Sequence, residues 1–326
     1  MKRIAPTLAA AAALAVAAIP ANAAVERVVE KTFSVQPGGN LHVGTIGGLI
    51  RVQSAAVSAV TVVAKEHIRA DSDAEADGLL KKLTLTIEQS GNDVSAVADY
   101  EKSPMGFHWN WPPVRVDFIV TVPAAYHADL KTSGGDITVS DLDGRVRART
   151  SGGDISLGKI SGEIDCETSG GNVSLGEGRS AIRLGTSGGS ISVGRAAGPA
   201  DLRTSGGDVR IDSAEGTLDA RTSGGDVRAV FIGALKGDCV LETSGGRVKA
   251  VVDAAAAFRL DASTSGGSVD AKGLAIALDG GRHHRSSLAG DVNGGGPLLR
   301  MRSSGGDIVV ETHGTTARRA ASPAVQ

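Results

Sequence analysis

One short sequence recurs through most of the chain and limits what the chain can fold into. The string Thr-Ser-Gly-Gly, followed by any residue and then Ile or Val, starts six times at intervals of 18 residues, from Thr132 to Thr222. Two more copies start at Thr243 and Thr264, each 21 residues after the copy before, and a Ser-Ser-Gly-Gly variant starts at Ser303. A repeat of about 20 residues is typical of a solenoid, whose coils bury their apolar side chains only by stacking on one another.

Alternation of apolar and polar residues within each repeat indicates strands. In Asp136-Ile137-Thr138-Val139 every second residue is apolar, and a second apolar pair, Val146 and Ala148, follows nine residues after Ile137. Equivalent pairs recur in the later copies, so each coil is predicted to hold two short strands, stacked in register at about 4.8 Å. The predicted fold class is therefore all-β: a parallel β-solenoid with coils of about 18–21 residues, preceded by an N-terminal β segment.

The paired glycines are predicted to make the turn at the same corner of every coil. Glycine reaches positive φ at no steric cost, and 45 of the 326 residues are glycine whereas only nine are aromatic. These structural turns are Gly134, Gly135, Gly152, Gly153, Gly170, Gly171, Gly188, Gly189, Gly206, Gly207, Gly224, Gly225, Gly245, Gly246, Gly266, Gly267, Gly305 and Gly306. The three-residue insertions in the later copies are expected to bulge at a corner. Residues 287–292 are interpreted as a degraded copy of the repeat.

The repeat region, residues 131–312, is flanked by segments of different character. Residues 24–130 keep the alternating pattern and are predicted to form an N-terminal β segment that starts or caps the solenoid. Within it, residues 45–50 are an irregular precursor of the repeat, and residues 72–82 are expected to form one or two helical turns. Residues 313–326 show no pattern and are predicted to be a disordered tail.

Residues 1–23 have the features of a secretory signal peptide. Lys2 and Arg3 precede an apolar run from residue 8 to residue 19, and Ala21-Asn22-Ala23 fits a signal-peptidase site. A retained membrane anchor is the alternative, but spanning needs about 20 apolar residues. The protein is therefore predicted to be exported, periplasmic or at the cell surface or secreted, with no transmembrane segment after signal removal. The formal net charge of −2 argues against nucleic acid as a partner.

The repeats and the segment before them resemble a known family. The tandem Thr-Ser-Gly-Gly-Asp-Ile/Val turns follow Val-Thr-Val-Pro-Ala-Ala-Tyr-His-Ala-Asp-Leu at residues 120–130, and together they resemble the putative-adhesin family of bacterial β-strand-repeat proteins. That family is a domain of unknown function. The resemblance covers roughly residues 40–312 and implies a β-solenoid in an envelope or extracellular setting.

Two kinds of chemistry were weighed for the repeat. The aspartate after the glycine pair, as at Asp136, suggests calcium, but Asn172, Ser190, Arg247 and Ser268 stand in the same column and interrupt any continuous row of ligands, which favours a turn-forming role. The outward column before each copy mixes positive and negative residues, which suits a solvated ladder better than a catalytic carboxylate pair. His283-His284 is interpreted as part of a loop. No catalytic residue, cofactor or metal is predicted.

Aromatic residues concentrate in a single segment. Phe107, Trp109 and Trp111 lie between Pro104 and Pro113 and include both tryptophans of the chain. An exposed patch there would form a binding surface for glycan, lipid or a protein partner, and the alternative is a cap on the solenoid.

The predicted function is a non-catalytic cell-envelope solenoid, a putative adhesin or binding scaffold for an unidentified envelope polymer or protein partner. The alternatives are a carbohydrate-active β-helix enzyme and an accessory or sensor protein in the envelope stress response. Cys166 and Cys239 fall in inward apolar columns four coil steps apart, about 19 Å at the spacing of stacked strands, so both thiols are expected to be free and buried.

Overall fold

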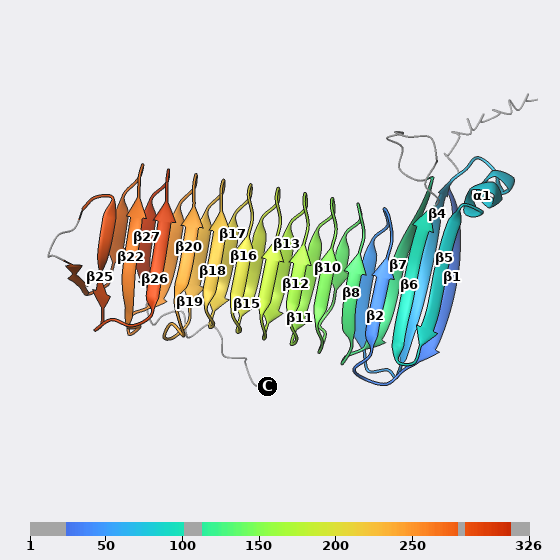
Figure 1. The fold of residues 1–326 in the computed structure, drawn as a ribbon, viewed down its shortest axis with the longest axis horizontal. Helices are drawn as coiled ribbons and strands as arrows, with labels where there is room; N and C mark the ends of the chain where they lie inside the picture. The colour runs from blue at the N-terminus through green and yellow to red at the C-terminus, as the bar shows by residue number, and fades with distance from the viewer. Residues whose placement is uncertain (1–23, 101–112, 280–283, 314–326) are drawn as a thin grey trace, which may run out of the picture.

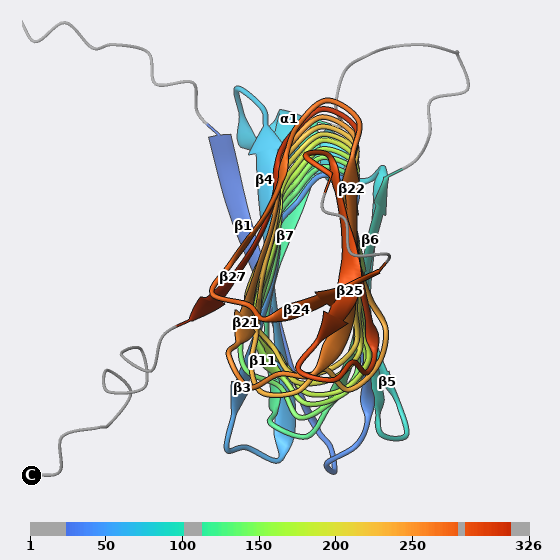
Figure 2. The same ribbon diagram turned by 90° about the vertical axis from the view of Figure 1, so that its left-hand side faces the viewer.

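The structure, a computed structural model, describes residues 24–100, 113–279 and 284–313. The described strands form two long sheets that face each other along the molecule, one with 13 strands (sheet A) and one with 14 (sheet B) (Figures 1 and 2). Only one helix, α1, is present in this part of the chain. The predicted all-β solenoid is confirmed.

Each copy of the repeat supplies one strand to each sheet. In sheet B these strands are β8 (His127–Lys131), β10 (Val146–Arg149), β12 (Ile164–Glu167), β14 (Ile182–Gly185), β16 (Ala200–Arg203), β18 (Leu218–Thr222) and β20 (Cys239–Thr243). In sheet A they are β9 (Ile137–Val139), β11 (Ile155–Ile160), β13 (Val173–Gly178), β15 (Ile191–Ala196), β17 (Val209–Ala214), β19 (Val227–Phe231) and β21 (Val248–Asp253). Neighbouring coils pair in parallel, with Val146 beside Ile164 and Ile164 beside Ile182.

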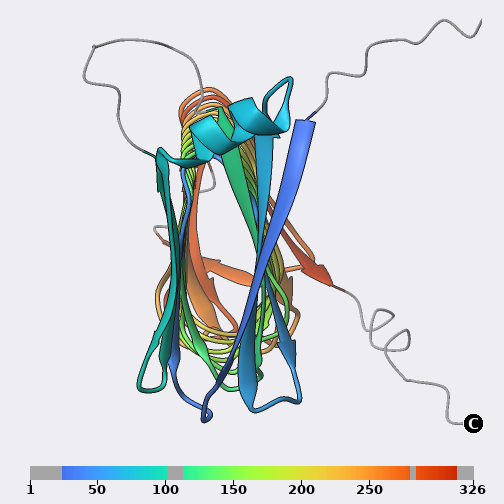
Figure 3. The same ribbon diagram turned by 90° about the vertical axis from the view of Figure 1, so that its right-hand side faces the viewer.

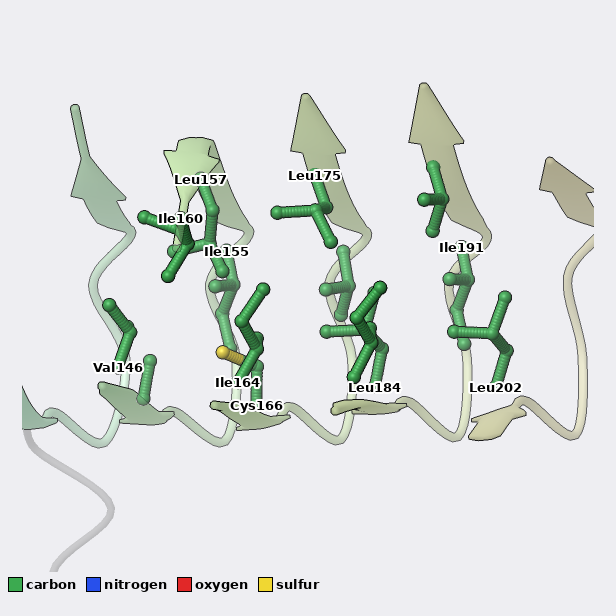
Figure 4. Close-up of a cluster of buried hydrophobic side chains, with 14 of the residues drawn as sticks. Val146, Ile155, Leu157, Ile160, Ile164, Cys166, Leu175, Leu184, Ile191 and Leu202 are labelled. Carbon is green, nitrogen blue, oxygen red and sulfur yellow. The ribbon is translucent and has the colours of Figure 1, made fainter. Parts of the chain in front are cut away.

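The core lies between the two sheets and consists of stacked columns of small and branched side chains. Because one 18-residue period equals one coil, the same inward position recurs directly above itself, as Val146, Ile164 and Ile182 do. Figure 4 shows buried side chains of these columns, among them Val146 and Ile164, between strands of the two sheets. Regular stacking therefore replaces the aromatic bulk that the composition lacks.

Both cysteines occupy such inward columns. Cys166 lies between Ala148 and Leu184 in sheet B, and Cys239 lies beside Leu299. Both are buried and neither forms a disulfide, as predicted. The insertion between β19 and β20 is also accommodated at a corner, since Val227 still pairs with Val248 in the next coil.

The N-terminal strands join the same two sheets, but not in chain order. Those strands are β1 (Ala24–Ser34), β2 (Asn40–Gly44), β3 (Ile50–Ala55), β4 (Ala59–Arg69), β5 (Leu83–Ser90), β6 (Asp93–Tyr100) and β7 (Val114–Pro123). The β2–β3 coil stacks directly on β8 and β9, whereas the later β6 and β7 lie outside it. Antiparallel β1, β4 and β5 complete this end.

Helix α1 (Asp73–Leu80) lies at the same end of the molecule (Figure 3) and matches the expected short helical segment. It begins after Ser72, whose hydroxyl accepts a hydrogen bond from the Glu75 amide at 3.3 Å. It buries Ala76, and its Asp77 pairs with Arg27 of β1.

At the C-terminal end the order of the coils differs from the order of the sequence. The strands there are β22 (Phe258–Thr264), β23 (Val269–Lys272), β24 (Ile276–Leu278), β25 (Ser287–Val292), β26 (Leu298–Ser303) and β27 (Ile308–His313). The β26–β27 coil lies between the β20–β21 coil and the β22–β23 coil. The Ser303 copy therefore stacks on the Thr243 copy, and the Thr264 copy is displaced outward.

The interpretation of residues 287–292 as a degraded coil was wrong. These residues form β25, which runs antiparallel to β22 and to β24. The chain can reverse because Asn293 and the three glycines after it all adopt positive φ. A reversed strand cannot continue a parallel coil, so β24 and β25 end sheet B instead (Figure 2).

Candidate binding surface

The threonines that start each repeat are buried and link neighbouring coils. The Thr186 hydroxyl donates to the carbonyl oxygen of Gly171 in the preceding coil at 2.8 Å and accepts from the amide of Gly189 at 3.3 Å. The equivalent hydroxyls from Thr132 to Ser303 repeat this arrangement, with donor distances of 2.7–3.0 Å. These hydroxyls are engaged in the corner and are not available to a ligand.

The glycine turns lie at the expected corners, but the reason for glycine differs from the prediction. None of the paired glycines, all of which are described, has a positive φ. The second glycine is instead required by close stacking: a Cβ on Gly153 would lie 2.1 Å from the carbonyl oxygen of Gly135. The corresponding distance in the other copies is 2.0–2.4 Å, too short for any side chain.

The aspartates after the glycine pairs also serve the backbone. Asp136 accepts a hydrogen bond from the amide of Asp154 in the next coil at 2.9 Å, and Asp154 accepts from Asn172 at 2.6 Å. Asn172 and Ser190 continue the column with their own side-chain oxygens. This geometry supports the turn-forming interpretation. The described residues contain no cluster of His, Cys, Asp and Glu suited to a metal ion.

Several residues singled out in the sequence fall outside the described part of the chain. Phe107, Trp109 and Trp111 belong to the segment between β6 and β7, and His283 also lies outside the described residues. His284 is described and forms an isolated bridge with Ser287. The aromatic segment stays a prediction.

The outer face of sheet B carries regular columns of charged side chains. Its outward side chains form two parallel columns, and the repeat brings each residue next to its equivalent in the adjoining coil. The first column contains Asp129, Arg147, Asp165, Arg183, Asp201 and Asp219, and the second contains Lys131, Arg149, Glu167, Gly185, Arg203, Arg221 and Glu242.

Ion pairs join these columns within and between coils. Arg203 pairs with Asp201 of its own strand at 2.7 Å and with Asp219 of the next coil at 3.7 Å. Arg221 pairs with Asp219 at 2.6 Å and with Glu242 at 3.1 Å. The hydrogen bond that Arg203 donates to the Asp201 carboxylate raises the pKa of Arg203 above its ordinary value. The sequence predicted a mixed, solvated ladder in the second column, and the structure adds these pairings.

A shallow groove of about 560 Å³ runs along the edge of this charged face, from the coil of β10 to the coil of β20. Its lining includes the small side chains Ala181, Pro199 and Thr217, which lie at successive corners. Five strand spacings of about 4.8 Å give it a length of about 24 Å. This groove is not among the features expected from the sequence, although the 18-residue spacing aligns Ala181, Pro199 and Thr217.

A second hollow of about 350 Å³ lies beside the groove, over Gly185 of β14. In the same column, the preceding coil has Glu167 and the following coil has Arg203, whereas Gly185 has no side chain. Both cavities are lined by Asp165, Arg183 and Asp201, so they adjoin at this part of β14.

The outer face of sheet A carries a row of hydroxyl side chains. Small hydroxyl residues, among them Ser156 and Ser174, follow one another along its central strands, and these two hydroxyls lie 3.1 Å apart. Glu177 at the adjoining corner pairs with Arg179 and Arg195, and the Arg179 hydrogen bond lowers the pKa of its carboxyl. In the described residues, no helix has both the length and the apolar character to cross a membrane.

Several solved structures contain similar chains. A lipid binding protein from Parabacteroides distasonis, described as putative, is 12% identical with a TM-score of 0.43, and a putative adhesin from Bacteroides fragilis is 13% identical with a TM-score of 0.36. A putative adhesin from Parabacteroides distasonis is 11% identical with a TM-score of 0.37. Each alignment covers 88% of this chain and 97% of the other. No curated protein matches the chain.

The family comparison agrees with the coil architecture. The Toastrack DUF4097 family matches residues 54–311, which run from the end of β3 to β27 and include every copy of the repeat. Most of the chain therefore lies within a single family match. The protein belongs to the Toastrack DUF4097 family.

Proposed function

We propose that this protein is an exported, non-catalytic scaffold of the cell envelope that binds a polymer or a protein partner along the outer face of sheet B. The observation that carries the proposal is the groove of about 560 Å³ that follows the solenoid axis over six strands, from β10 to β20. A long groove with a repeating lining suits an extended ligand, because each coil offers a similar set of contacts. The names of the similar structures, adhesin and lipid binding protein, are consistent with a binding role.

The carboxylates beside the groove favour binding over hydrolysis. Glycoside hydrolysis needs one carboxyl that is protonated and one that is free to act as base or nucleophile. Asp201 and Asp219 lie side by side on adjacent coils. Asp201 accepts a hydrogen bond from Arg203 at 2.7 Å, and Asp219 accepts one from Arg221 at 2.6 Å. Both carboxylates are therefore engaged by arginine side chains and not arranged as a free acid and base pair. A carbohydrate-active enzyme remains the alternative, and an accessory role in envelope stress is a further one.

A polymer screen tests the proposal. Purified protein, residues 24–326, is titrated with envelope polysaccharides, peptidoglycan fragments and lipid vesicles, and each polymer is then analysed for shorter products. We expect saturable binding to at least one polymer with no change in its length. Product formation would support the enzyme alternative, and absence of binding to every polymer would leave only a protein partner.

Export and the aromatic segment need separate tests. N-terminal sequencing of the protein from its own cells is expected to begin at Ala24, consistent with removal of residues 1–23. Replacing Trp109 and Trp111 together by Ala separates the two roles of the aromatic segment. A binding surface predicts weaker ligand binding at unchanged melting temperature, and a cap predicts a lower melting temperature, since loss of each buried aromatic costs about 3–5 kcal/mol.

A further inference from the structure

The β26–β27 coil fills a slot between two coils that precede it in the chain. The Thr264 copy follows the Thr243 copy by 21 residues, the same interval that separates the adjacent Thr222 and Thr243 copies. The Thr243 and Thr264 copies are nevertheless not adjacent, because β26 pairs with β20 on one side and with β22 on the other (Figure 1). In sheet A, β27 lies in the same way between β21 and β23. Both walls of the slot therefore come earlier in the chain than the coil that fills it.

Both walls match the filling coil at the corner and in the core. The Ser303 hydroxyl donates to the carbonyl oxygen of Gly246 on one wall at 2.8 Å. The Thr264 hydroxyl of the other wall donates to the carbonyl oxygen of Gly306 in the coil, also at 2.8 Å. Four inward side chains of the coil are buried: Leu299, Met301, Ile308 and Val310. Without this coil the walls would present open strand edges, and such edges pair with any strand that fits them.

The chain enters the slot through a short connection, residues 293–297. Because β25 and β26 lie on opposite sides of β22, this connection crosses two strand spacings, about 9.6 Å. Asn293 holds it against the turn before β22 by donating to the carbonyl oxygens of Ala254 and Ala256, both at 2.9 Å. The glycines at positions 294–296 all adopt positive φ and can change conformation at little steric cost. The connection can therefore act as a hinge for the β26–β27 coil.

We propose that the β26–β27 coil exchanges between two copies of this chain, each copy filling the slot of the other. The contacts within each slot are the same as in a single chain, because the two copies are identical, and only the hinge changes conformation. Within one chain, a short linker gives the coil an effective concentration of about 1 mM at its own slot. Exchange therefore increases with protein concentration during folding. It becomes the main outcome when the hinge is too short to reach the chain's own slot.

Closure of the empty slot is the competing arrangement within one chain. If β22 paired directly with β20, Ala262 would take the place of Met301 in the core. In sheet A, Ala271 would take the place of Val310. The closed arrangement would bury less apolar surface, since both replacements are smaller side chains. A coil from a second copy restores the larger side chains, which favours exchange over closure.

Shortening the hinge is the first test. With residues 294–296 deleted from the chain of residues 24–326, only Asn293 and Pro297 join β25 to β26. Three Cα-to-Cα steps span at most about 10–11 Å, which leaves no length to pass around the start of β22. At about 10 μM, far below the effective concentration, we expect a dimer fraction at least about tenfold above that of the unmodified chain. Size-exclusion chromatography with light scattering measures it. The matched control, three glycines added after Gly296, should stay monomeric.

Cysteines placed on separate chains identify the element that is exchanged. Val240 of β20 pairs with Arg300 of β26, so in an exchanged dimer these two residues come from different copies. With Cys166 and Cys239 replaced by Ala and the hinge shortened, chains carrying Val240→Cys are refolded together with chains carrying Arg300→Cys. We expect a disulfide-linked heterodimer. The control pairs Val240→Cys with Asp261→Cys and should give no such link, because β22 stays with its own chain.

The unmodified chain supplies a test that does not depend on the deletion. After unfolding in urea, it is refolded at about 10 μM and at about 1 mM, and the dimer fraction should rise at least about tenfold at the higher concentration. The Val240→Cys and Arg300→Cys chains with unmodified hinges should form their link only at the higher concentration.

Three outcomes would overturn the proposal. These are a folded deletion variant that remains monomeric, a dimer fraction of the unmodified chain that does not depend on refolding concentration, and a dimer that forms without the link between positions 240 and 300. Equal linking in the Asp261→Cys control would show non-specific association and would also count against exchange. If the deletion variant does not fold, as judged by circular dichroism, the refolding of the unmodified chain decides.

Discussion

At the scale of single residues, the corner of each coil is set by how closely the backbones approach. Gly153 shows this clearly, because its α-carbon faces the carbonyl of Gly135 in the preceding coil. The paired glycines lie at the predicted corners, but the prediction was wrong about their role: glycine is needed there for space and not for positive φ. A Thr hydroxyl at each corner then joins the same two coils by hydrogen bonds.

Replacing the second glycine of a pair should therefore destabilise the protein far more than replacing the first. In Gly153→Ala the new Cβ would lie 2.1 Å from a backbone oxygen, so the coils must separate, at a cost of about 3 kcal/mol or more. In the matched control, Gly152→Ala, the nearest atom is 3.6 Å away, and the cost should stay below about 1 kcal/mol. Urea unfolding of both variants measures the difference. Equal losses would show that stacking is not the reason for the second glycine.

Glu66 illustrates a different residue-level effect, a carboxyl in an inward column of β4. It is only 7% exposed, between Ala64 and Ile68, and burial raises its pKa above the usual value while the charge of Arg27 partly opposes this. Because the folded pKa is raised, the contribution of Glu66 to stability is complete below the pKa of the unfolded chain. It is lost as the pH rises through the folded pKa.

Glu66→Gln should consequently stabilise the protein at neutral pH and not under acidic conditions. The amide has nearly the same shape as the acid but carries no charge to desolvate. We expect a higher melting temperature than the wild type at pH 7.5, with the gap closing towards pH 4. A gap that does not depend on pH would mean that the ionisation of Glu66 is not linked to folding.

At the scale of elements, the ends of the solenoid depart from simple sequential stacking. The β2–β3 coil lies inside β6 and β7, and the β26–β27 coil lies inside β22 and β23. At the N-terminal end the chain forms the inner coil first, and the later strands β6 and β7 pair on its outer side. At the C-terminal end the chain forms the outer β22–β23 coil first, and the later β26–β27 coil pairs on its inner side. The outermost elements are antiparallel or short strands, and β1 carries the charged residues Glu26, Arg27, Glu30 and Lys31, which discourage edge-to-edge association.

Engineered disulfides can test the coil order at the C-terminal end. Val240 pairs with Arg300, whereas Asp261 lies one strand further out and pairs with Arg300 on its other side. With Cys166 and Cys239 replaced by Ala, the Val240→Cys/Arg300→Cys variant should oxidise readily, since neighbouring strands are about 4.8 Å apart. The Val240→Cys/Asp261→Cys variant spans two spacings, about 9.6 Å, and should remain reduced. The opposite result would restore the order of the sequence.

At the scale of the whole molecule, a continuous core runs between the two sheets from β4 to β22. Because each coil contacts mainly its two neighbours, positions several coils apart are held at fixed and large separations. The native cysteines report on this directly. They lie on β12 and β20, with β14, β16 and β18 between them in sheet B.

Thiol titration without reductant should find no reactive group in the folded protein and two after denaturation. Burial raises the pKa of Cys166 to about 12 and also raises that of Cys239, so neither forms the reactive thiolate near neutral pH. The four strand steps between them, about 19 Å, exclude an intramolecular disulfide in the folded state. A Cys166–Cys239 bond in the purified protein would contradict both the register and the stacking.

The repeat by itself determined the all-β solenoid, the inward columns, the free and buried cysteines and the position of every corner. It could do so because one period equals one coil, so in-register stacking relates residues a constant distance apart in the chain. The tertiary structure alone decided the order of the coils at both ends, where antiparallel strands allow later segments to pair beside earlier ones. It also decided which ion pairs form across the outer face of sheet B. These depend on which arginine reaches which carboxylate between coils, and several pairings fit the same sequence of charges.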